Sequence, residues 1–257
     1  MTIIKGFLRA TILAPILAAG SAFAAEPLYC PQKEARIAVL GDSLADGLWA
    51  SLYRSSVTCK TLTLFRVTEV SDGLIKTDPS EWSERLTSNL GEVATADLVL
   101  IQMGANDIRP IRTETGRAMF GTPEWDAAYA DRAGELLSDV KVVANDAIWV
   151  GLPIVGDEEL EVSYSKLSAI QSALMAKDDP SAKTSVFVDV HEATKFGTEG
   201  FVQSIALNEN MTTLRAPDRI HFTEKGYDMV VGVFRDELER RLRSRDTEAH
   251  LDTLALQ

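Results

Sequence analysis

Residues 35–52 read A-R-I-A-V-L-G-D-S-L-A-D-G-L-W-A-S-L, and this stretch decides the fold. Its first half is a short apolar run, from Ile37 to Leu40, that breaks at Gly41. Apolar residues then recur at helical spacing, so the pattern predicts a strand, a sharp turn and a helix. The turn places Ser43 at the start of the helix and at the carboxyl end of the strand, where open α/β sheets bind their ligands.

Ser43 has two interpretations at this position. A serine at the start of a helix commonly caps it, by accepting a hydrogen bond from a backbone N–H. A serine there can also attack a carbonyl carbon, because the free N–H groups of the helix terminus help to hold the resulting oxyanion. The stretch alone favours the cap, so the choice depends on the rest of the chain.

The composition bounds the kind of protein. The chain has 257 residues, of which 46% are hydrophobic and 25% charged, which is typical of one large α/β domain with a buried core. A net charge of −12, without any basic stretch, argues against nucleic acid as a partner. No cluster of His, Cys and Asp has the spacing of metal ligands, so we expect neither a metal nor another cofactor.

The N-terminal segment has the pattern of a secretory signal. Two basic residues, Lys5 and Arg9, flank the start of an apolar run, and the small-x-small triplet Ala22-Phe23-Ala24 follows it. The pattern predicts a signal peptide over residues 1–24, with an uncleaved anchor helix as the alternative. We therefore expect a periplasmic or secreted domain over residues 25–257, without stable membrane insertion.

An exported protein can form disulfides, and the chain has two cysteines. Cys30 precedes the first predicted strand and Cys59 precedes the second, so a bond between them would attach the N-terminal segment to the edge of the sheet. Two unpaired thiols are the alternative. Neither cysteine has a histidine partner in a motif, which disfavours a cysteine nucleophile.

Strands alternate with helices five times along the chain. This alternation predicts a single doubly wound α/β domain of three layers, with a five-stranded, mainly parallel sheet. Its core extends over about residues 36–243, and we expect the tail from Ser244 onward to fray. Two stretches, 105–123 and 191–217, have little periodicity. The expected strands lie at 37–40, 61–67, 97–103, 147–153 and 185–190, and the later helices at 78–90, 123–144, 161–176 and 223–243.

A nucleophilic serine needs a base and a group that orients the base. Asp218 lies three residues before His221, a spacing that lets the carboxylate fold back onto the imidazole. His191, after the fifth strand, is a weaker candidate for the base. The alternative is that this segment only precedes the last helix, with Thr223 as its cap, although both interpretations can hold together.

Two further residues have the right chemistry to donate hydrogen bonds to an oxyanion. Gly73 offers a backbone N–H in a place where a side chain would obstruct a substrate, and Asn106 offers a side-chain amide. Each has a simpler alternative, a turn glycine and an Asx turn. Asp107 is expected to brace its loop rather than to react.

In their order and spacing, these segments resemble the four sequence blocks of the SGNH hydrolases, also called GDSL esterases. The matching segments are G-D-S-L at 41–44, Gly73, G-A-N-D at 104–107, and Asp218 with His221. The resemblance extends over about residues 36–242 and implies the flavodoxin-like α/β/α fold of these enzymes.

The resemblance also implies roles. Ser43 would be the nucleophile, His221 the base and Asp218 the group that orients the base. The oxyanion hole would consist of the N–H groups of Ser43 and Gly73 and the amide of Asn106. One departure is Asp72, which stands where a small neutral residue is expected before the glycine, and which we therefore expect to face solvent.

Further segments resemble an exported bacterial SGNH subfamily of uncharacterised function. These are S-D-G-L-I, G-A-N-D-I-R-P-I-R, E-W-D-A-A-Y, W-V-G-L-P and R-A-P-D-R-I-H-F-T. Within them, Arg109 and Arg112 are candidates to bind a carboxylate on the substrate. The alternative is that they brace their loop through Asp107 or Glu114.

The sequence therefore predicts an exported serine esterase that removes small acyl groups, such as acetyl, from a cell-envelope glycan or a related small ester. One alternative is an O-acyltransferase with the same residues, in which a sugar hydroxyl replaces water. A second alternative is a catalytically inactive glycan-binding protein on the same fold.

Overall fold

The computed structural model describes residues 26–255 apart from residue 182. The predicted signal peptide therefore lies outside the described residues. None of the described helices is both long and apolar enough to cross a membrane.

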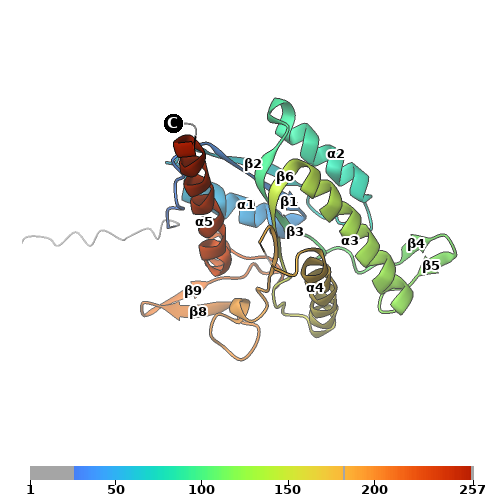
Figure 1. Ribbon diagram of the computed structural model, residues 1–257. Helices are drawn as coiled ribbons and strands as arrows, with labels where there is room; N and C mark the ends of the chain where they lie inside the picture. The colour runs from blue at the N-terminus through green and yellow to red at the C-terminus, as the bar shows by residue number, and fades with distance from the viewer. Residues whose placement is uncertain (1–25, 182, 256–257) are drawn as a thin grey trace, which may run out of the picture.

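A five-stranded sheet forms the centre of the molecule (Figure 1). Its strands, in spatial order, are β2 (Leu62–Thr68), β1 (Ala35–Gly41), β3 (Ala96–Gln102), β6 (Ala144–Val150) and β7 (Ser185–Val188). Every neighbouring pair is parallel, so the predicted, mainly parallel sheet is confirmed and is fully parallel. The middle strands are apolar on both sides because helices cover both faces.

Helices lie on both faces of the sheet, as the doubly wound prediction requires (Figure 1). One face is covered by α1 (Ser43–Ser56) and α5 (Glu224–Ala255), which contact each other. The other face is covered by α2 (Pro79–Leu90), α3 (Pro123–Val143) and α4 (Glu158–Asp178). Two apolar cores result, one on each side of the sheet. The three-layer α/β/α architecture that the resemblance implies is therefore confirmed.

The two stretches expected to be irregular contain short elements. Residues 105–123 include a hairpin of β4 (Ile111–Thr113) and β5 (Gly116–Ala118). Residues 191–217 include the 3₁₀ helix η2 (Ala193–Lys195). They also include a second hairpin, of β8 (Ser204–Leu207) and β9 (Asn210–Thr213). Strands of three or four residues are too short to show an alternating pattern. A further 3₁₀ helix, η1 (Gly91–Val93), follows α2.

The C-terminal helix is longer than predicted. We expected fraying from Ser244, but α5 continues to Ala255. Contacts with the N-terminal segment hold the helix just beyond Ser244, where fraying was expected: Asp246 accepts hydrogen bonds from the hydroxyl of Tyr29 at 2.7 Å and from the backbone N–H of Gln32 at 3.0 Å. A polar tail sequence does not reveal such long-range partners.

Cys30 and Cys59 form a disulfide, with Cα atoms 5.4 Å apart. The predicted bond is thus confirmed. It connects the N-terminal segment to the residues just before β2, the edge strand of the sheet.

Removing this bond in the double variant Cys30→Ser/Cys59→Ser should lower the free energy of unfolding by about 3–4 kcal/mol, because a link between residues 29 positions apart restricts the unfolded chain. Urea denaturation measures the difference. Wild-type protein treated with a reductant is the control and should match the variant. An unchanged unfolding midpoint would show that the bond contributes nothing.

Candidate active site

The turn that carries Ser43 begins where the backbone of β1 lies very close to that of β3. Gly41 has φ of +144°, and a Cβ built there would lie 1.9 Å from the carbonyl oxygen of Gln102 on β3. Only glycine fits between the strands at this point. Asp42 then caps α1, since its carboxylate accepts the N–H of Leu44 at 2.9 Å. Because Asp42 is the cap, the hydroxyl of Ser43 is free for another role.

Ser43, His221 and Asp218 form a continuous chain of hydrogen bonds. The Oγ of Ser43 lies 2.7 Å from Nε2 of His221, and Nδ1 of His221 lies 2.7 Å from Oδ2 of Asp218. The serine and the histidine are 178 positions apart in the sequence and meet because β1 and the loop before α5 end at the same edge of the sheet. The imidazole is 35% exposed, so solvent and substrate can reach it.

Asp218 is fixed by its own loop. Its Oδ1 accepts the backbone N–H groups of Ile220 at 2.9 Å and of His221 at 3.0 Å. Partial desolvation opposes ionisation, but these hydrogen bonds and the bond to the imidazole outweigh it and keep the pKa of Asp218 below its ordinary value. The group beside the imidazole is therefore a carboxylate at neutral pH.

The two histidines that were candidates for the base have different partners in the structure. His191 hydrogen bonds through Nε2 to Glu161, whereas His221 contacts Ser43. Thr223 accepts the N–H of Gly226 at 3.2 Å at the start of α5, so the predicted cap is confirmed beside the Asp218–His221 pair.

Two predicted donors lie ready to contribute N–H groups. Ser43 is the first residue of α1, so no carbonyl within the helix accepts its backbone N–H. Asn106 donates from Nδ2 to the carbonyl oxygen of Asp72 at 2.9 Å. An amide has two N–H groups, and no hydrogen bond among the described residues uses the second one.

Gly73 differs from expectation. Its N–H donates to Oδ1 of Asp72 at 2.7 Å, so this donor is already in use. The expectation that Asp72 faces solvent is wrong, since the residue is only 2% exposed. Thr77 and Arg85, at 2.9 and 3.2 Å from Oδ2, satisfy the buried carboxylate. Gly73 itself is needed because a Cβ would lie 2.3 Å from Oδ1 of Asp107.

Two buried carboxylates join the loops that carry these donors. Oδ2 of Asp42 accepts the N–H groups of residues 104–105 at 3.2 and 3.0 Å. Asp107 accepts the N–H groups of residues 74–75 at 3.2 and 3.0 Å, which confirms its expected bracing role. The role of Asp42 was not predicted from the sequence, although its position directly after β1 placed it at the same edge as residue 104.

Burial changes the acidity of both groups. Desolvation raises the pKa of Asp42 to about 7 and that of Asp107 to about 6, even though backbone N–H groups favour the charged forms. In the unfolded chain such carboxyls titrate near 4. Between these values the folded state binds more protons, so the free energy of unfolding must fall as the pH rises through this range.

The variant Asp42→Asn tests this linkage. For a pKa of about 7 in the folded state, Asp42 should account for about 2 kcal/mol of the loss in unfolding free energy between roughly pH 5.5 and 7.5. An amide does not titrate, so the variant should lose this part of the dependence while the part due to Asp107 persists. Urea denaturation at both pH values measures it. Equal slopes in the two proteins would show that Asp42 does not titrate in this range.

Arg109 and Arg112 lie in the stretch after Asn106, and both side chains are exposed. Neither makes an ion pair in the part of the chain that the structure describes, so the proposed bracing through Asp107 or Glu114 is absent. Instead, the backbone of Arg109 helps to hold the loop, because its carbonyl accepts Nε1–H of Trp125 at 2.6 Å. Binding of a substrate carboxylate by these two arginines stays a prediction.

A groove of about 460 Å³ adjoins the Asp218 loop. Apolar side chains and the acidic N-terminus of α4 form its walls, so it offers both apolar and hydrogen-bonding contacts beside the histidine. It is lined by Ile108, Asp157, Glu159, Leu160, Ser163, Asp218 and Ile220.

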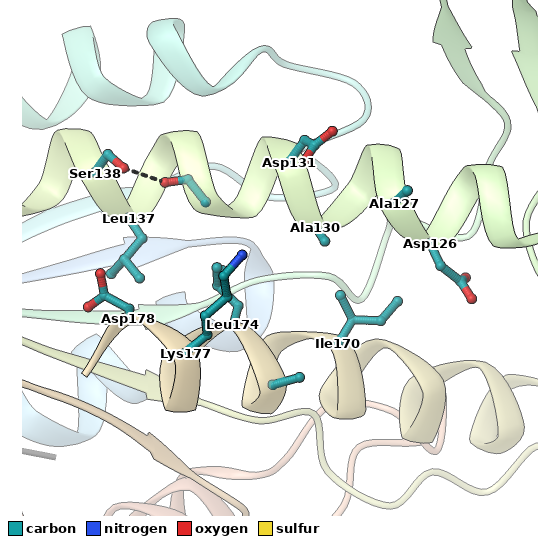
Figure 2. A pocket seen from close by; sticks show the side chains of 12 residues that line it. Asp126, Ala127, Ala130, Asp131, Leu137, Ser138, Ile170, Leu174, Lys177 and Asp178 are labelled. Carbon is teal, nitrogen blue, oxygen red and sulfur yellow. Dashed lines mark hydrogen bonds between the residues drawn. The ribbon is translucent and has the colours of Figure 1, made fainter. Parts of the chain in front are cut away.

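A larger groove, of about 830 Å³, lies between α3 and α4. Figure 2 shows Ala130 and Leu137 from α3 facing Ile170 and Leu174 from α4. None of the residues that line it belongs to the serine–histidine–aspartate chain, so the larger groove is separate from the candidate active site. Among the described residues, no group of three or more His, Cys, Asp or Glu side chains is arranged to hold a metal ion.

The fold is that of the SGNH, or GDSL, hydrolases, and the matching sequence blocks resemble theirs. Solved structures with this fold include the aryl esterase of M. smegmatis, which is 17% identical over 80% of this chain and 99% of its own, with a TM-score of 0.53. A catalytic mutant of Axe2, an acetylxylan esterase from Geobacillus stearothermophilus, is 14% identical over 83% of this chain and 96% of its own, with a TM-score of 0.54. TesA is 16% identical over 80% and 99%, with a TM-score of 0.51.

Within this class, the chain belongs to the DUF459 family, described as proteins of unknown function, whose profile matches residues 36–237. Comparison of the sequence with curated proteins found no match. The family and fold are thus established, and the reaction has to be argued from the site.

Proposed function

We propose that this chain is a serine esterase in which Ser43 is the nucleophile, His221 the general base and Asp218 the residue that orients the base. The observation that carries the proposal is the pair of 2.7 Å contacts that connect Ser43 Oγ, the imidazole and the Asp218 carboxylate. Both bonds are within the range for proton transfer and for fixing the tautomer of a histidine.

The proposed reaction has two steps. Nε2 of His221 takes the hydroxyl proton while Ser43 Oγ attacks the acyl carbon, and the same proton then passes to the departing alcohol. Water next attacks the acyl–serine ester and gives its proton to His221. This step releases the acid and restores the Ser43 hydroxyl. Asp218 stays ionised and stabilises the imidazolium in both steps.

Charge develops on the carbonyl oxygen in each step. The proposed donors to this oxygen are the N–H of Ser43 and the unused amide N–H of Asn106, both fixed before the substrate arrives. The N–H of Gly73 could join them only after leaving Asp72. In this proposal, the N–H groups of Ser43 and Asn106 can bind the oxyanion at once, whereas that of Gly73 must first break its hydrogen bond to Asp72.

The substrate is proposed to be a small acyl ester on an exported glycan or a related alcohol. The signal-like N-terminus and the Cys30–Cys59 disulfide support a location outside the cytoplasm. An aryl esterase and an acetylxylan esterase share the fold, which makes aryl acetates and acetylated oligosaccharides the first substrates to test.

Labelling with a fluorophosphonate tests the nucleophile directly. The wild-type protein should be labelled, whereas Ser43→Ala and His221→Ala should not be, because labelling needs both the hydroxyl and its base. We expect hydrolysis of p-nitrophenyl acetate by these variants to fall on the order of 10⁴-fold or more. Ser138→Ala, an exposed serine in the α3–α4 groove, is the control and should react as wild type. If the folded wild-type protein is not labelled, this result would contradict the proposed esterase function and favour a binding protein.

Asn106→Ala tests the oxyanion donor. Loss of one preorganised donor should lower kcat by about 10²–10³-fold, with little change in KM, because the bond is made mainly in the transition state. Steady-state kinetics with the same ester measure both constants. The matched control is Asn89→Ala, whose amide only hydrogen bonds within α2. A rise in KM alone would assign Asn106 to substrate binding instead.

A further inference from the structure

Arg215 is a buried cation just ahead of the loop that carries Asp218 and His221. The residue is 1% exposed, and it makes no ion pair with a carboxylate in the part of the chain that the structure describes. Burial lowers the pKa of its guanidinium to about 9, which still leaves it charged at neutral pH. The charges of Glu161 and Asp218 favour the charged guanidinium from a distance, but neither pairs with it directly. Burying a charge without a direct ion pair is costly, so the position calls for an explanation.

The guanidinium donates to carbonyl oxygens from three separate segments. Nη1 donates to Ile220 in the triad loop at 3.0 Å, and Nη2 donates to Ile154 after β6 at 2.6 Å and to Thr194 in η2 at 3.4 Å. Its face lies over the ring of Phe222, 3.7 Å from the centroid. A planar, forked donor is suited to such an arrangement, whereas a lysine ammonium is not.

The bond to Ile220 acts on the peptide unit next to the imidazole. The carbonyl of that unit belongs to Ile220 and is held by Arg215, and its N–H belongs to His221 and donates to Asp218. Because a peptide unit is planar, fixing both its ends fixes its orientation. The same contacts therefore set the direction of the Asp218 carboxylate relative to the imidazole.

The loop needs such support because its backbone is strained. Arg219, between Asp218 and Ile220, has φ of +64°, a left-handed conformation that costs a residue with a side chain on the order of 1 kcal/mol. Its carbonyl accepts the N–H of Gly156 at 3.1 Å, next to the segment that Arg215 contacts. The loop is thus stabilised by contacts from outside itself.

We propose that Arg215 is a positioning residue, which holds the 220–221 peptide so that the Asp218 carboxylate and the His221 imidazole stay aligned with Ser43. The proposal rests on the proposed esterase function for its kinetic test. It goes beyond that function because the residue makes no hydrogen bond to the reacting groups and instead holds the loop that carries two of them.

The test uses Arg215→Lys, which keeps the positive charge but removes the planar guanidinium that donates to several carbonyl groups at once. We expect kcat for p-nitrophenyl acetate to fall on the order of 10- to 100-fold, with KM changed less than about twofold, as for a small misplacement of reacting groups. The low-field proton resonance of the His221 Nδ1–H, a signature of its hydrogen bond to Asp218, should weaken or disappear. The variant Arg215→Ala should recover part of its kcat when guanidinium ion is added at non-denaturing concentration.

Arg241→Met is the control. Arg241 is a second buried arginine on α5, and it pairs with Asp146 on β6 and with Glu237 on α5, away from the loop. It should lower the melting temperature but leave kcat and the low-field resonance unchanged. If Arg215→Lys does not melt cooperatively, Phe222→Leu removes the aromatic face beneath the guanidinium, and we expect a smaller loss by the same readouts.

Arg215→Lys with full kcat and an intact resonance would overturn the proposal while leaving the esterase function in place. Wild-type protein that shows neither labelling nor hydrolysis would overturn the esterase function instead. In that case the resonance of wild type and variant still decides whether Arg215 aligns the histidine.

Discussion

The carboxylate of Asp42 joins parts of the site that the sequence keeps apart. One oxygen caps the helix that begins with Ser43, and the other accepts two N–H groups from the loop that carries Asn106. This buried side chain therefore links the helix that begins with Ser43 directly to the loop that carries Asn106. The pairing of β1 with β3 brings the two loops together, and the Asp42 contacts fix one against the other.

Three buried ionisable side chains around the site are hydrogen bonded mainly to backbone groups rather than paired with an opposite charge. Asp42 and Asp107 accept N–H groups, and Arg215 donates to carbonyl oxygens. Such bonds are directional and link segments at defined angles, which apolar contacts do not. The cost of desolvating each charge is offset by the contacts that it organises. These bonds thus give the loops at this end of the sheet a fixed geometry.

The sequence revealed most of the fold because its signals are local. Apolar runs marked the five strands of the sheet, and glycines at positions 41 and 104 marked where two of them end. The association of Ser43, Asp218 and His221 was also predictable, since such residues at strand ends meet at one edge. The structure was needed to show the distances between them. It was also needed to show that Asp42, and not the hydroxyl of Ser43, caps the helix.

Other features depend on distant partners and could not be predicted. Asp72 is buried because Thr77 and Arg85 meet its carboxylate, and nothing in its neighbours along the chain indicates this. The part of α5 around Asp246 is held by contacts with the N-terminal segment. Arg215 stood in a quoted motif, yet its burial depends on carbonyl groups from three loops. In each case the missing information was a contact that exists only in the folded structure.

The distance along the chain between Ser43 and His221 has a consequence for biosynthesis. The serine is made early, whereas the histidine follows 178 positions later, just before α5. In the proposed reaction, a growing or truncated chain that ends before His221 therefore carries a serine without its base. The proposed esterase would gain its reactivity only after the loop before α5 has been made and has folded against the turn after β1.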